Sequence, residues 1–164
     1  MVAFTTRMPS GVPGNPSRPG TPTEIEQNII NTTTPPLRYG EPVKMDSATG
    51  QIKPIQAGDT TAAIYGVLVR PFPSNSGTSP LGTSTPPTSG MCDVMKSGYI
   101  NVKVNSGTPV RGGAVFVRTI TGTDTVIGGI AGASDGANTF TWVGAYFTGG
   151  VDASGNSEIH FRVN

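Results

Sequence analysis

The sequence predicts an all-β fold, a sandwich or a barrel of short strands joined by many turns. Glycine (23) and proline (15) together approach a quarter of the 164 residues, and charged residues make up only 13%. That charged fraction is about half the usual value for a soluble domain. From about Tyr39 onward, β-branched and aromatic residues recur in short runs, which favours a folded body over disorder.

The first 36 residues differ from the rest because they hold seven of the fifteen prolines. Proline lacks an N–H donor and fixes φ, so this stretch is expected to join no central strand and no long helix. Drawn out as polyproline-like chain, ~36 residues would span about 110 Å. A folded remainder of this length should be only ~35–40 Å across. We therefore expect an extended N-terminal arm over residues 1–36 that lies in solvent or on a neighbouring subunit.

One feature interrupts this arm. Thr23 and Glu26 have the spacing of a capping box and precede Gln27-Asn28-Ile29-Ile30. A short helix at 24–30 is one possibility, although a helix of two turns is marginal by itself.

Residues 37–164 are expected to form the β domain. The run from Ile100 to Val104 alternates apolar and polar residues with the period of a half-buried strand. Ser97-Gly98 suggests a tight turn between two strands, and Pro54 places its strand at a sheet edge. The expected strands are residues 42–45, 52–55, 62–70, 91–96, 99–104, 114–120, 126–130, 139–147 and 158–163, which gives eight or nine.

One connection is long. Residues 71–90 contain five prolines and no charged residue. Ordering twenty residues costs on the order of 20–40 kcal/mol of backbone entropy. We expect a mobile excursion or a segment fixed by a partner.

The net charge of +1, without any run of Lys or Arg, argues against nucleic acid or an anionic membrane as partner. No apolar stretch approaches the roughly 18 residues of a membrane span. The first residues lack the features of a signal peptide, so synthesis in a cytoplasm is expected. A single cysteine, Cys92, excludes an internal disulfide and a cysteine-based zinc cluster.

The chain offers little for catalysis or for binding a metal or cofactor, and none of these is expected. His160 alternates with apolar residues in the last predicted strand, so a structural role is favoured over that of a catalytic base. Cys92 has no evident histidine partner and is interpreted as an inert thiol. The spacing Asp152-x-Ser154-x-Asn156-x-Glu158 superficially suggests calcium, but it equally suits a hairpin turn. Asn31-Thr32-Thr33 matches a glycosylation acceptor, which a cytoplasmic product would not use. Trp142 is expected in the core.

Three stretches resemble the jelly-roll cement proteins that decorate the heads of tailed phages. They are Tyr39-Gly40-Glu41-Pro42-Val43; then Ile64 to Pro73, a strand that ends in an Arg and an aromatic–Pro corner; and Ser97-Gly98-Tyr99 through Gly112 to Arg118 and on to Gly149. The resemblance covers about residues 37–164. It implies a jelly-roll-like β-sandwich of antiparallel strands.

The resemblance also implies a structural virion protein, not an enzyme, that cements an assembled capsid from its outer surface by bridging neighbouring capsomers. Its partners would be the major capsid protein and other copies of itself, in a dimer or trimer. Apolar anchors and arginines of the arm suit such contacts. The candidate interface residues are Phe4, Arg7, Met8, Val12, Arg18, Arg70 and Phe72.

Because a fold does not fix a function, two alternatives stay open. The same scaffold could carry a carbohydrate-binding or host-attachment module, although aromatic residues are only 7% and lie mostly within predicted strands. An enzyme would require His160 or a pair of carboxylates to act in turnover.

Overall fold

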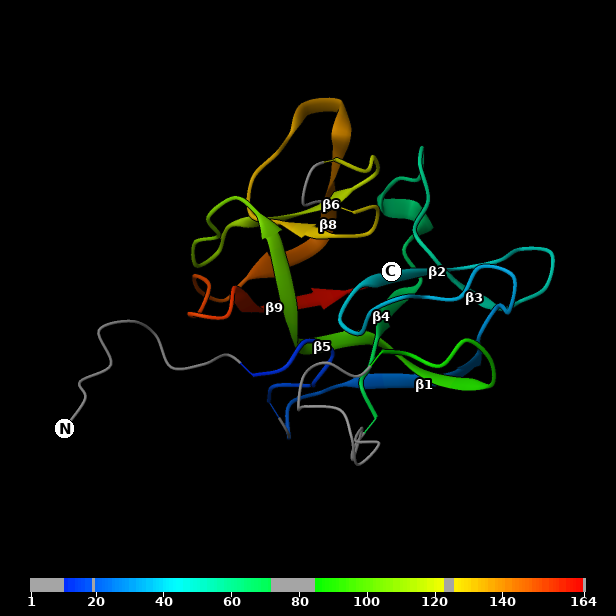
Figure 1. The fold of residues 1–164 in the computed structure, drawn as a ribbon. Helices are drawn as coiled ribbons and strands as arrows, with labels where there is room; N and C mark the ends of the chain where they lie inside the picture. The colour runs from blue at the N-terminus through cyan, green and yellow to red at the C-terminus, as the bar shows by residue number, and fades with distance from the viewer. Residues whose placement is uncertain (1–10, 19, 72–84, 123–125, 164) are drawn as a thin grey trace.

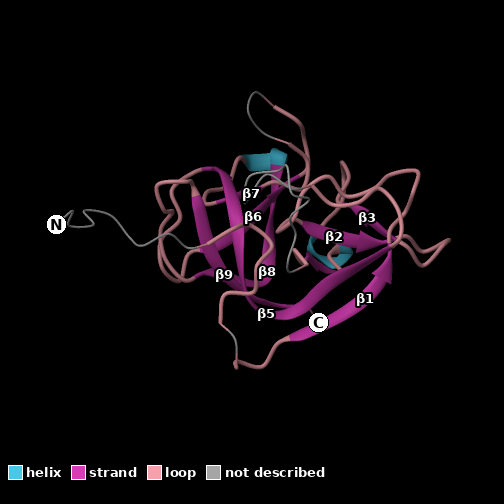
Figure 2. Ribbon diagram, turned by 60° about the horizontal axis from the view of Figure 1, so that its bottom comes forward, coloured by secondary structure: helices cyan, strands magenta, loops and turns pink. Residues whose placement is uncertain are grey.

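The computed structural model describes residues 11–18, 20–71, 85–122 and 126–163. These residues form an all-β structure in which nine strands belong to one hydrogen-bonded sheet (Figures 1 and 2). The strands are β1 (Glu24–Ile29), β2 (Pro42–Met45), β3 (Ile52–Pro54), β4 (Gly66–Leu68), β5 (Met91–Ser106), β6 (Ala114–Arg118), β7 (Ile130–Ala131), β8 (Thr139–Phe147) and β9 (Asn156–Arg162). Two single-turn 3-10 helices, η1 (Thr61–Ala63) and η2 (Gly136–Asn138), lie between them. No helix in this part of the chain is long and apolar enough to cross a membrane.

The 16-residue strand β5 organises the fold because other segments pair with both of its edges. On one edge it pairs first with β1 and then with β9, and the change of partner falls at Ser97, which is opposite both Glu24 and Arg162. On the other edge it pairs with β4 near its start and with β7 near its end. The alternation of Ile100, Val102 and Val104 with polar residues puts one face of this strand in the core, since all three are buried.

The second half of β5 belongs to a closed ring. The ladders run from β5 to β7, β6, β8, β9 and back to β5. All are antiparallel except β5–β7. The ring contributes most of the larger core, whose bulkiest members Trp142, Phe147 and Phe161 are at most 2% exposed, and residues of the other sheet such as Val67 and Met95 complete it. The predicted core position of Trp142 is confirmed.

The first half of β5 carries the sheet β3-β2-β4-β5-β1, seen below and to the right of the ring in Figure 1. A smaller core of Tyr39, Val43, Ile52, Leu68 and Val94 holds it together. The body therefore has two lobes that share one strand and part of the larger core.

The predicted fold class is confirmed: the chain is all-β, nine strands are present, and the architecture is consistent with a β-sandwich. The strands expected at 42–45 and 139–147 agree with β2 and β8. The stretch expected as a strand at 62–70 is shorter, because η1 occupies its start. Of residues 126–130, only Ile130 belongs to a strand, since Gly129 N bonds to Val126 O in a turn.

The hairpin predicted at Ser97-Gly98 was wrong, because β5 continues through both residues. Gly98 has φ of 131°, and a β-carbon there would lie 3.0 Å from Thr23 Oγ1. The glycine thus accommodates a close neighbour where β5 changes partner, and it does not reverse the chain.

The short helix considered at 24–30 was also wrong, because residues 24–29 form β1. A two-turn helix would have little stability by itself, whereas the ladder with β5 pairs six backbone positions. Much of the expected arm therefore lies on its own body. Of the long connection at 71–90, residues 72–84 fall outside the described part of the chain.

Candidate interaction surface

Residues 11–18 complete the body by filling the edge of β5 between β4 and β7. Pro16 forms a bridge to Ile100, which lies in the middle of that edge. The backbone contacts are Gly14 N to Asn101 O (2.8 Å), Asn101 N to Asn15 O (3.0 Å), Ser17 N to Tyr99 O (3.0 Å) and Arg70 N to Gly14 O (2.9 Å). Proline has no backbone N–H to donate. The proline-rich segment can still pair with β5 because its contacts are isolated hydrogen bonds from non-proline residues and do not form a continuous ladder.

An ion pair fastens the end of this segment. Arg18 donates from Nε and Nη2 to the two carboxylate oxygens of Glu158, at 3.1 and 2.6 Å. Thr148 Oγ1 donates to the same carboxylate at 2.6 Å. Burial alone would raise the pKa of Glu158, but the hydrogen bonds from Arg18 and Thr148 outweigh it and lower that pKa to about 2. Glu158 is therefore a fixed anion that holds the arm.

Aromatic rings surround this pair. The Arg18 guanidinium lies 4.0 Å from the centre of the Tyr99 ring. The His160 ring lies against Tyr99 and Tyr146, at 4.6 and 5.1 Å between ring centres. Burial first, and then the charge of Arg18, lower the pKa of His160, so the imidazole is neutral near pH 7. His160 is thus a packed strand residue, as the sequence favoured.

A pocket of about 370 Å³ opens beside these rings. Its lining combines two arginines with two tyrosines: Arg18, Tyr99, Arg111, Gly112, Tyr146 and Thr148. Arg111 is exposed, and within the described residues it makes no hydrogen bond or ion pair. Nothing in the sequence selects Arg111 or pairs Glu158 with Arg18, although the pair Gly112-Gly113 after Arg111 is a recognisable turn signal.

The predicted interface residues have different positions. Phe4, Arg7, Met8 and Phe72 lie outside the described residues. Val12 is partly buried in the docked segment. Arg18 makes the bidentate carboxylate contact expected of it, but to Glu158 of its own chain.

Arg70 departs from the expected interface role because it is 7% exposed. Its guanidinium lies 4.8 Å from the centre of the Tyr39 ring, and Nε donates to Pro13 O at 3.2 Å. Arg70 thus holds the N-terminal segment on its own body.

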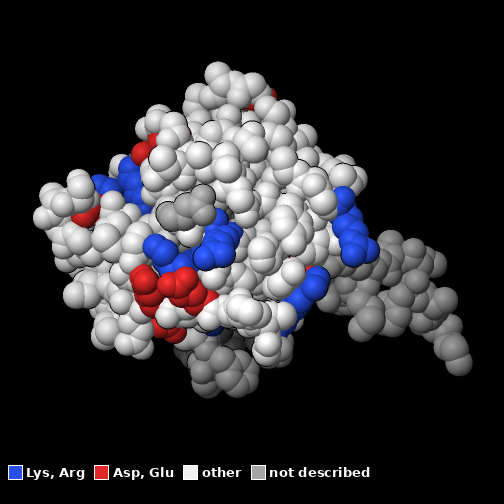
Figure 3. Space-filling model, turned by 180° about the vertical axis from the view of Figure 1, so that it is seen from behind, with Lys and Arg blue, Asp and Glu red and all other residues white. Residues whose placement is uncertain are grey.

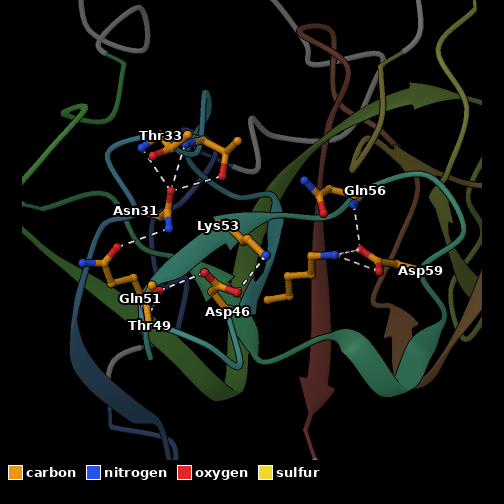
Figure 4. Close-up of polar contacts among 10 residues, drawn as sticks. Asn31, Thr33, Asp46, Thr49, Gln51, Lys53, Gln56 and Asp59 are labelled. Atoms are coloured by element: carbon orange, nitrogen blue, oxygen red, sulfur yellow. Dashed lines mark hydrogen bonds and ion pairs between the residues drawn. The ribbon is translucent and has the colours of Figure 1, made fainter.

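Polar contacts fix the loops of the β2–β3 lobe (Figure 4). Lys53 pairs with Asp46 at 3.0 Å and Lys44 with Asp59 at 2.6 Å. Asn31 is 8% exposed, and its side chain accepts from the backbone N–H groups of Thr33 and Thr34 and donates to Gln51. Its amide is therefore engaged, which disfavours the glycosylation motif.

The residues whose spacing suggests calcium, Asp152 to Glu158, include a turn that Asp152 stabilises. Asp152 Oδ1 accepts from the backbone N–H groups of Ser154 and Asn156, at 2.8 and 2.9 Å. Glu158 is bound to Arg18. Among the described residues, no group of three or more His, Cys, Asp or Glu side chains could hold a metal ion. Burial, with a smaller effect of Asp93, raises the pKa of Cys92 to about 11, in keeping with an inert thiol.

Large apolar side chains are exposed on several elements. On β1 and the facing end of β5 they are Ile25, Ile29 and Met91, between 44% and 64% exposed. On β8 they are Val143 and Tyr146, 65% and 40% exposed, and others such as Leu37, Val110 and Val151 lie in loops. β1 lies at the bottom of Figure 1 and β8 in its upper part. Seen from behind, the surface is largely uncharged, with Lys and Arg in a few separate groups (Figure 3).

Comparison with known proteins identifies a family and a solved structure of related fold. A family model described as XM1 gp53 minor capsid protein matches residues 1–161. The chain is also similar to a protein in the solved structure described as the capsid of Myoviridae Phage XM1. The TM-score is 0.69, with 17% sequence identity over 97% of this chain and 95% of that one, which establishes a shared fold. No curated protein matches the chain.

Proposed function

This chain belongs to the XM1 gp53 minor capsid protein family, and from that premise we propose that it cements a phage capsid by bridging neighbouring capsomers. It is a phage capsid accessory protein with a structural role in the virion, as its sequence predicted. The finer proposal is that it sits on the outer surface and contacts the major capsid protein and further copies of itself.

The observation that carries the bridging role is that apolar side chains are exposed on two strands, β1 and β8, of one body. On β1 the exposed Ile29 lies opposite Met91 in the β1–β5 ladder. On β8 the exposed residues are Val143 and Tyr146. Exposed apolar groups of this kind suit contacts with other proteins. Two such surfaces would let one molecule touch two neighbours, and many weak contacts on a shell multiply through avidity.

The body suits this role because its central strand has no long free edge. Both sides of β5 are paired, which favours a rigid block over a chain that rearranges. We propose that the residues ahead of the docked segment, including Phe4, Arg7 and Met8, supply a further contact with a neighbouring subunit. Residues 11–36 serve the body itself.

Co-sedimentation with assembled capsids that lack this protein tests the proposal. The full chain should bind, and a chain without residues 1–10 should bind more weakly at an unchanged thermal midpoint. A chain without residues 1–22 is the contrasting variant, because it also loses the Arg18–Glu158 pair and should melt earlier. Absence of binding by the full chain would reject the cement function. Equal binding by the chain without residues 1–10 would reject the contact assigned to Phe4, Arg7 and Met8.

The glycan-binding alternative has one supporting feature, the 40% exposed Tyr146 beside a pocket. Sugars commonly stack on exposed aromatic rings. A glycan array distinguishes the two functions, because micromolar binding that is lost in Tyr146→Ala would favour host attachment.

A further inference from the structure

We propose that the pocket between the turn at residues 110–113 and β8 binds a carboxylate side chain of the capsid subunit on which this protein sits, with Arg111 as the recognising group. The inference rests on the proposed function and specifies the chemistry of one contact. It follows from the turn that presents Arg111, from the charges around the pocket, and from the pocket's lining.

The turn holds Arg111 in a defined place. Gly113 N donates to Val110 O at 2.9 Å, and Gly112 has φ of 76°. These are the marks of a type II turn, in which the third position favours glycine and the second, here Arg111, projects from the tip. Gly112 N also donates to Phe147 O at 2.7 Å, which ties the turn to the end of β8. Arg111 is thus carried by a short turn fastened to the ring.

The charge of Arg111 is the one left uncompensated in the pocket. Arg18 is the other cation in the lining, and it is paired with Glu158. His160, behind the tyrosines, has its pKa lowered by burial and by Arg18, and contributes no charge near pH 7. An anion is therefore the ligand that this pocket favours.

The shape and the surroundings favour a protein side chain as the anion. A guanidinium can hold a carboxylate through two parallel hydrogen bonds, which a compact pocket with one free arginine can accommodate. The exposed side chains of Val110 and Tyr146 adjoin the pocket, and arginine and tyrosine are the residue types most often found at the centres of protein interfaces. A phosphate backbone would instead call for a run of cations, which the sequence lacks.

The test uses the full chain and assembled capsids that lack it. Arg111→Gln removes the charge and the paired donors. Arg162→Gln is the matched control, because the Arg162 side chain is also exposed, makes no hydrogen bond or ion pair with the described residues, and does not line the pocket. We expect Arg111→Gln to raise the Kd for capsids about tenfold, the loss of a central arginine contact, with the control within about twofold. Arg111→Lys should recover only part of the affinity, since lysine lacks the paired donors.

A second arm examines the partner's chemistry. Capsids whose surface carboxylates have been converted to amides should bind the wild type and Arg111→Gln with equal affinity. Tight binding of wild type to native capsids with no effect of Arg111→Gln would overturn the inference and leave the cement function standing. No binding of wild type to native capsids would overturn both. If Arg111→Gln bound capsids as tightly as wild type but lost binding to an acidic polysaccharide of the host, the pocket would be assigned to a glycan and the inference would be overturned.

Discussion

Replacing Arg18 with methionine should loosen the docked N-terminal segment by a predictable amount. The pKa of Glu158 falls from 4.5 to about 2 in the folded chain, which corresponds to ~3 kcal/mol of stabilisation of the carboxylate. Arg18 shares this effect with Thr148, and its own side chain is 46% exposed, so solvent screens part of its contribution. We expect a loss of about 1–2 kcal/mol in the free energy of unfolding, or roughly 3–6 °C in the thermal midpoint.

The pH dependence separates the ion pair from simple packing. A carboxylate whose pKa is depressed stabilises the fold above its unfolded pKa of 4.5, and this contribution is lost as the pH falls through about 2. The difference between wild type and Arg18→Met should therefore shrink over that interval. Urea unfolding at pH 7, 4.5, 3 and 2, with Glu158→Gln and the double variant, completes a double-mutant cycle with an expected coupling of about 1 kcal/mol at pH 7. A penalty that stays constant with pH, or a coupling near zero, would refute the reasoning.

Three further perturbations address other parts of the body. Gly14→Ala should lower the free energy of unfolding by about 2–4 kcal/mol, because φ is +88° and the new β-carbon would lie 2.6 Å from Tyr39 Cβ. Gly50→Ala is the control: its φ is +67° and no atom lies within 4 Å of the new β-carbon, so the loss in the same urea titration should be only about 1 kcal/mol. Burial raises the pKa of Glu41 to about 7, so the stability that its protonated form contributes is present below pH 4.5 and lost as the pH rises to 7. Glu41→Gln should therefore be more stable than wild type by about 1–3 kcal/mol at pH 8, with the advantage vanishing near pH 4.5; an equal difference at both values would contradict this assignment. Cys92, with its pKa near 11, should react with iodoacetamide at pH 8 at least about tenfold more slowly in the folded chain than in urea, and equal rates would show an accessible thiolate.

The strands were predictable where apolar residues alternate with polar ones along the sequence. In β5 and β9, apolar residues at alternate positions such as Ile159 and Phe161 point into the core, and this period is visible in the sequence. The pattern failed where tertiary pairing overrides local preference. Ser97-Gly98 has the composition of a turn, and Thr23 to Glu26 that of a helix start, yet both stretches lie in or beside the ladders of β5.

The candidate site was less predictable because its residues meet only in three dimensions. Arg18 and Glu158 are 140 positions apart, and no periodicity connects them. Arg70 was selected as an interface residue for its position at a strand end, and the structure places it under the segment that includes Pro13. A charged residue next to a proline-rich stretch can hold that stretch on its own body as well as it can bind a partner.

This last distinction changes how a proline-rich N-terminus contributes to a capsid contact. Residues 14–17 give backbone groups to β5, and one edge of β1 gives a six-position ladder to the same strand, so these particular groups are not available to a neighbour without opening the body. A chain that withdrew these residues would expose the edge of β5 around Tyr99 and Asn101, and an open edge invites unspecific pairing. The contacts that we propose with other subunits therefore do not use these backbone groups, and we propose that they draw on side chains of finished surfaces and on residues ahead of Gly11. A preformed surface binds with little loss of conformational entropy, which suits a protein that adds to an already assembled shell.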